Sequence, residues 1–197
     1  MPVFTDLTGL LGSALLIAVA VLQLPRIQRL PSRYLALLTA ATILLSLIPF
    51  SALPAAAYVR GMVGDLSVTT VVLMLIALLR PHCVVVANHE LRHIYIVLAV
   101  AAVCLYPLAL GVGVYDPYRL GYSNMLFIAT VLLFAIAALL IRENLVALCL
   151  TLATLAWSLG WYESTNLWDY LIDPLVAVYA IGALLKVGVC RLIASKS

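Results

Sequence analysis

Residues 162–174 read Tyr-Glu-Ser-Thr-Asn-Leu-Trp-Asp-Tyr-Leu-Ile-Asp-Pro, and a long apolar run lies on each side of them. The stretch brings three carboxylates, an amide and several aromatic rings together in a chain of 197 residues that is 66% hydrophobic and only 10% charged. Tyrosine and tryptophan beside long apolar segments are typical of the interface between a membrane and water. The stretch therefore predicts a connection just outside a lipid bilayer, between two membrane-spanning segments.

The composition of the whole chain is that of a membrane protein. Its mean hydropathy is +1.20, and apolar runs of about 18 residues or more, the length that a transmembrane helix needs, recur along it. A water-soluble core could not enclose so much apolar surface in so short a chain. Because every backbone amide inside a bilayer needs a partner within its own segment, the spans must be helices. We therefore predict an all-α, polytopic transmembrane helix bundle that forms one integral membrane domain over residues 1–197.

Seven segments of the chain are apolar and long enough to be spans. They cover residues 7–24, 34–53, 62–79, 94–114, 125–141, 144–161 and 174–194. Asp173 precedes the last segment as a predicted N-cap, with Pro174 at the first helical position. Asp65 falls in the early turn of the third segment, where an ionised carboxylate is costly unless a partner compensates it.

The basic residues predict the orientation of the bundle. With the N-terminus outside, nine of the eleven basic residues fall on the cytoplasmic side, as the positive-inside rule requires, and the C-terminus is cytoplasmic. These nine are Arg26, Arg29, Arg33, Arg80, Arg92, Arg142, Lys186, Arg191 and Lys196. We predict a protein of the bacterial inner (cytoplasmic) membrane whose basic face meets anionic membrane lipid, and we expect no nucleic-acid binding.

The second half of the chain contains a faint tandem repeat. Residues 108–116 resemble residues 155–163, and the two helices that follow share a similar run of small and apolar residues. The pattern suggests two copies of one helical hairpin, at 94–141 and 144–194, although low-complexity apolar sequence also produces such matches.

A candidate metal site lies in residues 89–93, His-Glu-Leu-Arg-His. Two histidines one helical turn apart can bind zinc, with the intervening glutamate placed to activate a bound water. These five letters resemble the zinc-binding helix of the site-2 proteases, whose later Asp-Gly motif the chain lacks. Glu143 is the third ligand that the topology offers beside His89 and His93, and the cation Arg92 opposes metal binding. The alternative is a polar interfacial loop that precedes the fourth span.

The histidines also raise the question of a haem. His82, His89 and His93 all come from one connection, whereas two axial ligands must approach a haem from opposite faces. We therefore expect no cofactor.

Three outer connections carry charged and aromatic residues together with turn-forming glycine or proline. If the helices pack as a bundle, these residues could converge on one shallow polar bowl, in which carboxylates pair with arginines or hold a cationic group. The alternative is an ordinary interfacial belt. The candidate residues are Arg60, Asp65, Asp116, Arg119, Glu163, Asn166, Trp168, Asp169 and Asp173.

These observations favour a non-catalytic membrane subunit that binds a partner protein or a lipid-linked, amphiphilic ligand through its extracytoplasmic face. The chain pairs no nucleophile with a base, which argues against a hydrolase of the serine or cysteine type. One alternative is an intramembrane metallohydrolase that uses His89, Glu90 and His93. A second is a small-solute transporter, although the predicted span centres have few polar residues.

Overall fold

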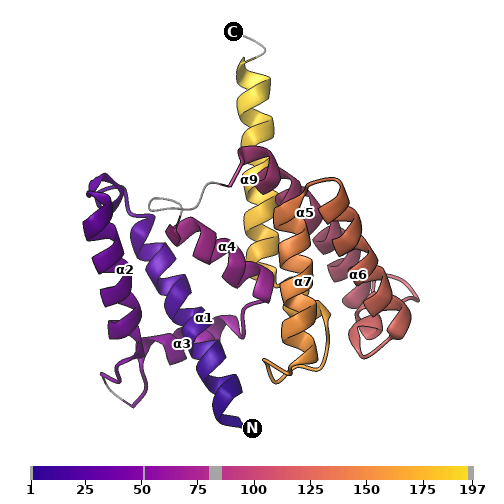
Figure 1. Ribbon diagram of the computed structural model, residues 1–197, viewed down its shortest axis with the longest axis horizontal. Helices are drawn as coiled ribbons and strands as arrows, with labels where there is room; N and C mark the ends of the chain where they lie inside the picture. Colours follow the sequence, from indigo (N-terminus) through magenta and orange to yellow (C-terminus); the bar gives the residue numbers. More distant parts are fainter. Residues whose placement is uncertain (1, 51, 80–85, 195–197) are drawn as a thin grey trace.

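The computed structural model describes residues 2–50, 52–79 and 86–194, and within these residues the regular secondary structure is entirely helical (Figure 1). The all-α prediction is confirmed. The helices are α1 (Pro2–Leu22), α2 (Ser32–Leu47), α3 (Ala55–Val63), α4 (Val68–Leu79), α5 (Asn88–Ala109), α6 (Met125–Leu140), α7 (Asn144–Ser158), α8 (Trp168–Leu171) and α9 (Pro174–Ala194), with 3₁₀ turns η1 (Ile27–Arg29) and η2 (Pro117–Gly121). Arg80, His82 and Lys196 lie outside the described residues.

Each of the seven predicted spans overlaps one of the longer helices, but helix length supports only one span. Among the described residues, α5 alone is long and apolar enough to cross a membrane by length and composition. Six further helices are apolar over 10–17 residues and fall short of that length. The number of seven spans therefore stays a prediction.

The third predicted span begins later than expected. Residues 62 and 63 still belong to α3, which ends at Gly64 with a φ of +80°, a conformation that glycine adopts at little cost. Helix α4 begins at Val68, and the Ser67 hydroxyl accepts a hydrogen bond from the Thr70 amide at 3.2 Å. Asp65 therefore lies in the link between α3 and α4. The prediction that it sits inside an apolar helix was wrong.

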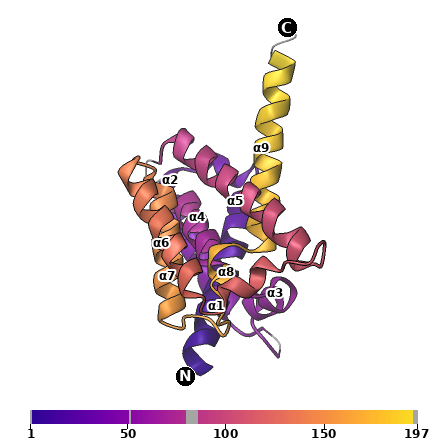
Figure 2. The ribbon, with the colours of Figure 1, turned by 90° about the vertical axis from the view of Figure 1, so that its right-hand side faces the viewer.

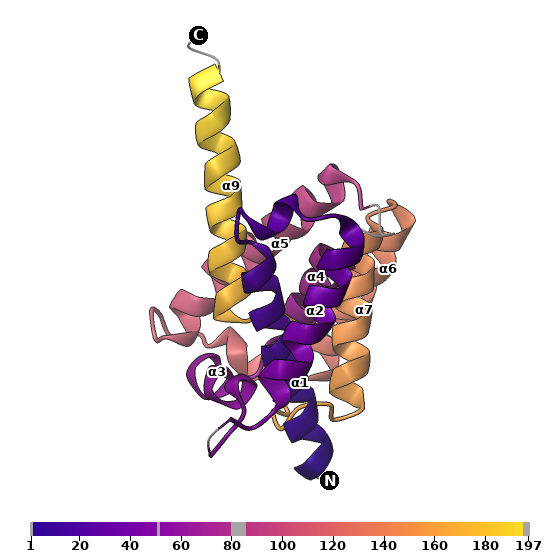
Figure 3. The same cartoon turned by 90° about the vertical axis from the view of Figure 1, so that its left-hand side faces the viewer.

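The helices form two groups that meet at α4. Helix α1 packs along α2 and α3, α6 packs along α7, and α5 packs along α9. Helix α4 contacts both α1 and α7 (Figure 1), and Figure 3 shows α1, α2 and α3 on one side of the molecule. The two termini lie at opposite ends (Figure 1). In Figure 2, α5 runs obliquely between α6 and α9.

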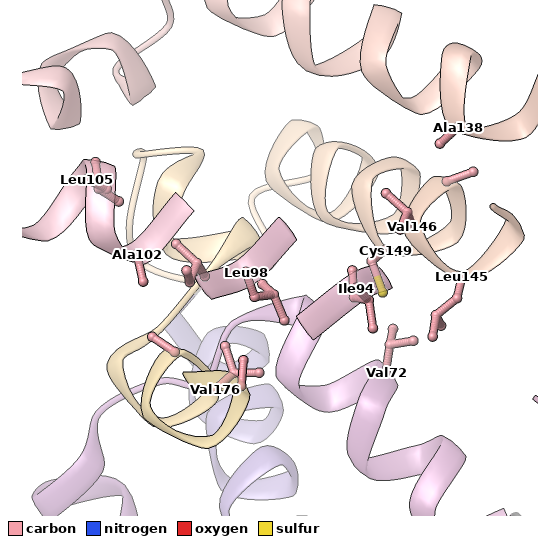
Figure 4. Packing of buried hydrophobic residues seen from close by; sticks show 14 residues of the cluster. Val72, Ile94, Leu98, Ala102, Leu105, Ala138, Leu145, Val146, Cys149 and Val176 are labelled. Carbon is pink, nitrogen blue, oxygen red and sulfur yellow. The ribbon is translucent and has the colours of Figure 1, made fainter. Parts of the chain in front are cut away.

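The larger core cluster joins α4, α5, α6, α7 and α9. In Figure 4, Ile94 of α5 lies beside Cys149 of α7, and both side chains are almost fully buried. Alanines at buried positions let the helices approach closely, as is usual between helices in membranes. The buried alanines of this cluster are Ala102, Ala138, Ala147, Ala177 and Ala180.

Helices α5 and α7 end in a similar way. Each is followed by a glycine with positive φ, Gly111 at +94° after α5 and Gly160 at +61° after α7. The connections then differ, because η2 follows α5 and the short helix α8 follows α7. That residues 94–141 and 144–194 are two copies of one helical hairpin therefore stays a prediction.

Candidate functional site

Asp173 lies at the junction of α9 and α4 and is 7% exposed. Its Oδ1 accepts a hydrogen bond from the Val176 amide at 2.8 Å, which confirms the predicted N-cap of α9. Its Oδ2 accepts from the Ser67 amide at 2.8 Å and from the Thr70 hydroxyl at 2.5 Å, at the start of α4. One carboxylate thus serves two helix N-termini, where the helix dipoles favour negative charge. Asp173 holds α9 and α4 together.

Two of the connections that are predicted to lie outside the membrane are joined through Asn166, whose side chain is fully buried. Its Nδ2 donates to the Tyr118 carbonyl at 3.0 Å, and its Oδ1 accepts from the Trp168 amide at 3.0 Å. The Trp168 indole donates to the Pro117 carbonyl at 3.0 Å. A Cβ atom at Gly121 would collide with the Asn166 side chain, so this close approach requires glycine. The segments 116–121 and 163–171 therefore form one unit, which we call the docked outer unit.

Asp169 completes this outer unit. Its carboxylate accepts from the Tyr118 hydroxyl, at 2.8 Å to Oδ1, and also from the Ser164 hydroxyl. Burial, together with the hydrogen bond to Asp169, raises the pKa of Tyr118 above its ordinary value. The Tyr170 hydroxyl accepts from the Tyr162 amide at 3.0 Å. Asn166, Asp169 and Tyr118 of the unit are thus bonded within the unit.

Arg60 forms a second polar cluster with two carboxylates. Its Nε lies 2.6 Å from Asp65 Oδ1, and its Nη1 lies 2.9 Å from Asp6 Oδ1. The hydrogen bond to Asp65 is the main reason that the pKa of Arg60 is raised. A Cβ atom at Gly9 of α1 would collide with both Arg60 and Asp65. The cluster therefore ties α1 to α3 and lines a cleft of about 550 Å³.

The remaining outer candidates have simpler roles. Asp116 caps η2, because its Oδ1 accepts from the Tyr118 amide at 3.0 Å. Arg119 and Glu163 are exposed and form no ion pair in the part of the chain that the structure describes. The nine candidates thus divide between the docked outer unit, the Asp173 junction and the Arg60 cluster. No ion pair among the described residues links these groups.

The histidine motif lies at the start of α5, next to the turn between α6 and α7. His93 Nδ1 lies 2.7 Å from Glu143 Oε1, and the rings of His89 and His93 are 5.9 Å apart between centroids. Glu90 Oε1 accepts from the side-chain Nδ2 of Asn144 at 3.4 Å. Within the described ranges, no group of three or more His, Cys, Asp or Glu side chains is placed to bind a metal ion. The His93–Glu143 contact instead links α5 to the α6–α7 turn.

A large apolar groove of about 870 Å³ opens between α5 and α6, with α7 beneath it. Its volume is in the range of pockets that bind small molecules. Its walls consist of aliphatic and aromatic side chains, and the few polar ones include His93 and Glu143. Representative lining residues are Val97, Leu98 and Ala101 of α5, Phe127, Phe134 and Ala137 of α6, and Val146, Cys149 and Leu150 of α7.

The two ends of the groove differ chemically. At one end, the rings of Phe127 and Trp168 lie 4.7 Å apart, beside the docked outer unit. At the other end, His93 and Glu143 line the groove. Measured along α6 from Phe127 to Ile141, the groove is roughly 21 Å long at 1.5 Å per residue. It is therefore an elongated apolar site with one polar end.

Sequence reasoning missed this groove. Its lining residues are ordinary apolar residues of three helices, and their spacing along the chain is the same as that of any buried helix face. Three of its lining residues are candidates in the sequence, but for other sites: His93 and Glu143 as metal ligands, and Trp168 in the polar bowl.

The sequence matches no protein family, no curated protein matches it, and no solved structure matches the fold.

Proposed function

We propose that this chain is a polytopic protein of the bacterial inner membrane, with seven spans, an outside N-terminus and a cytoplasmic C-terminus. It acts as a non-catalytic membrane subunit that binds an amphiphilic, lipid-like ligand. The observation that carries the proposal is the groove of about 870 Å³ between α5 and α6, because its apolar walls and elongated shape match a hydrocarbon chain.

The arrangement of the chain supports a place in the membrane. The termini lie at opposite ends of the molecule (Figure 1), which agrees with an odd number of crossings. Many large apolar side chains are exposed on the outer faces of the helices, a surface that lipid solvates and water does not. On α6 these include Leu133, Ile136, Leu139 and Leu140, which are between 56% and 78% exposed.

The polar clusters support a non-catalytic role. Both oxygens of Asp173 and both of Asp169 accept hydrogen bonds within the protein, and Arg60 is paired with two carboxylates. Groups that are bonded in this way stabilise the outer connections and offer little to a ligand. We therefore expect the ligand to bind in the groove and not at the extracytoplasmic loops.

Retention of lipid after delipidation tests the proposal. The protein is purified in mild detergent, washed with excess detergent, and examined by native mass spectrometry. We expect the wild-type protein to retain lipid, and Ala137→Phe, which fills the groove, to lose it. Ile136→Phe is the matched control, because Ile136 is the neighbouring residue on α6, is 56% exposed and does not line the groove.

Two outcomes contradict the proposal. The first is a wild-type protein that retains no lipid under conditions in which it stays folded. The second is equal lipid retention by Ala137→Phe and Ile136→Phe, which would place the lipid on the general outer surface of the bundle.

A further inference from the structure

Glu143 lines the polar end of the groove with one carboxyl oxygen that has no partner. Its Oε1 lies 2.7 Å from Nδ1 of His93, which also lines the groove. Its Oε2 is buried and has no hydrogen-bond partner among the described residues. A buried polar atom without a partner costs free energy, and native structures usually supply one. A ligand that brings a donor to Oε2 therefore gains a hydrogen bond that the chain alone leaves unmade.

The other oxygen of Glu143 ends a short chain of hydrogen bonds. Arg92 Nη2 lies 3.4 Å from His93 Nε2. A guanidinium can only donate, so His93 Nε2 accepts in this contact and the imidazole proton is on Nδ1. His93 Nδ1 then donates to Glu143 Oε1. The three side chains together carry one positive and one negative charge, and Oε2 is the acceptor that they leave open.

These contacts favour a neutral donor over a charged one. Arg92 balances the charge of Glu143 through the imidazole, so a second cation would leave an excess positive charge beside apolar walls. Moving an ammonium group from water to such walls is far more costly than moving a hydroxyl. An anionic head would be repelled by the carboxylate of Glu143. A hydroxyl donates one hydrogen bond and carries no charge.

The aromatic end of the groove is less suited to a polar head. The indole N–H of Trp168 is already donated to the Pro117 carbonyl at 3.0 Å. Among the described residues, the buried side-chain atoms without a partner are Glu143 Oε2 and the hydroxyl of Tyr106, and Tyr106 does not line the groove. A ligand therefore places its head at Glu143 and its chain along the groove toward Phe127.

We infer that the groove binds a lipid alcohol, a neutral amphiphile whose hydroxyl donates to Glu143 Oε2 and whose hydrocarbon chain lies along the apolar walls. The inference rests on the proposed function and names the class of its ligand. The Glu143 side chain is 18% exposed and the terminal torsion of a glutamate is soft, so a small turn of the carboxylate brings Oε2 to a hydroxyl in the groove. In the proposed topology the hydroxyl lies at the cytoplasmic interface and the chain lies within the bilayer.

Competition among amphiphiles with the same hexadecyl chain tests the inference. Delipidated full-length protein is immobilised in detergent and loaded with tritiated hexadecanol, and unlabelled competitors displace it in a scintillation proximity assay. Hexadecyl methyl ether has the same chain but no hydroxyl proton. We expect it to compete roughly tenfold more weakly than hexadecanol, the effect of one hydrogen bond to a carboxylate. Hexadecylammonium should also compete more weakly than hexadecanol, because its charge must be buried.

The variant Glu143→Gln locates the selectivity. Its amide keeps an oxygen for His93 and places an NH₂ group at the position of Oε2, which donates to an alcohol and to an ether alike. We expect the preference for hexadecanol over the ether to fall to about onefold. The matched control is Glu90→Gln, which removes a carboxylate from the first turn of α5 outside the groove lining. The control should retain the preference, because an amide oxygen can still accept from Asn144.

The possible outcomes separate the inference from the proposed function. Equal competition by hexadecanol and the ether in the wild-type protein overturns the inference and leaves the proposed function intact, since the chain alone then decides binding. The inference is also overturned if hexadecylammonium competes better than hexadecanol, or if Glu90→Gln loses the preference as fully as Glu143→Gln. If the folded wild-type protein binds no hexadecanol, the inference is wrong, and the proposed function fails with it only if the protein also retains no lipid. Hexadecanol binding that Ala137→Phe leaves unchanged places the amphiphile outside the groove and overturns both.

Discussion

The docked outer unit and the polar end of the groove use polar residues in opposite ways. In the outer unit, Asn166 and Asp169 are bonded to groups of the chain itself, and Asn166 is fully buried. At the polar end of the groove, the Oε2 atom of Glu143 is buried and has no hydrogen-bond partner among the described residues. The difference shows that a dense polar segment can serve folding, whereas a polar atom without a partner beside an apolar groove is better placed for a ligand.

Replacement of Asp173 by alanine should have the largest effect on stability. The change removes an N-cap and leaves the Ser67 amide and the Thr70 hydroxyl without their acceptor in a buried site. We expect a loss of about 3 kcal/mol or more in the free energy of unfolding, measured by denaturant titration in detergent micelles. A loss as small as that of Asp116→Ala, which removes only the cap of η2, would show that the junction contributes little.

Replacement of Asn166 by alanine should come next. Its loss leaves the Tyr118 carbonyl and the Trp168 amide without partners and loosens the outer unit. We expect a cost of about 2 kcal/mol in the free energy of unfolding, by the same titration, with lipid binding unchanged. Glu163→Ala is the control, because Glu163 is exposed, and its effect should stay within about 0.5 kcal/mol. If Asn166→Ala lost lipid binding without losing stability, the docked outer unit would serve the ligand and not the fold.

Asp65→Asn should have the smallest effect. Asp65 and Arg60 are 25% and 20% exposed in their side chains, so their ion pair is partly screened by solvent. We expect a loss of about 1 kcal/mol in the free energy of unfolding and no change in lipid retention. A double-mutant cycle with Arg60→Gln measures the coupling of the pair. Reduced lipid retention in folded Asp65→Asn would indicate that the ligand binds at the outer face and not in the groove.

Local chemistry made several helix boundaries predictable. Helices α6, α7 and α9 begin at the predicted residues Met125, Asn144 and Pro174. Asn124 and Asp173 cap α6 and α9 from the position just before each helix, and such short-range signals can be read from neighbouring letters. The start of α4 was missed, because the positive φ of Gly64 was not anticipated.

By itself, the sequence determined the helical class, several of the helix boundaries and the strong apolar character of the chain, because each depends on composition or on residues a few positions apart. Only the tertiary structure decided what the polar residues contact. The partners of Asp173 and Asn166 lie 106 and 48 positions away, and the groove arises where α5 and α6 stand apart over α7. Hydrogen bonds and voids between distant segments depend on how the helices pack, and no local pattern encodes that arrangement.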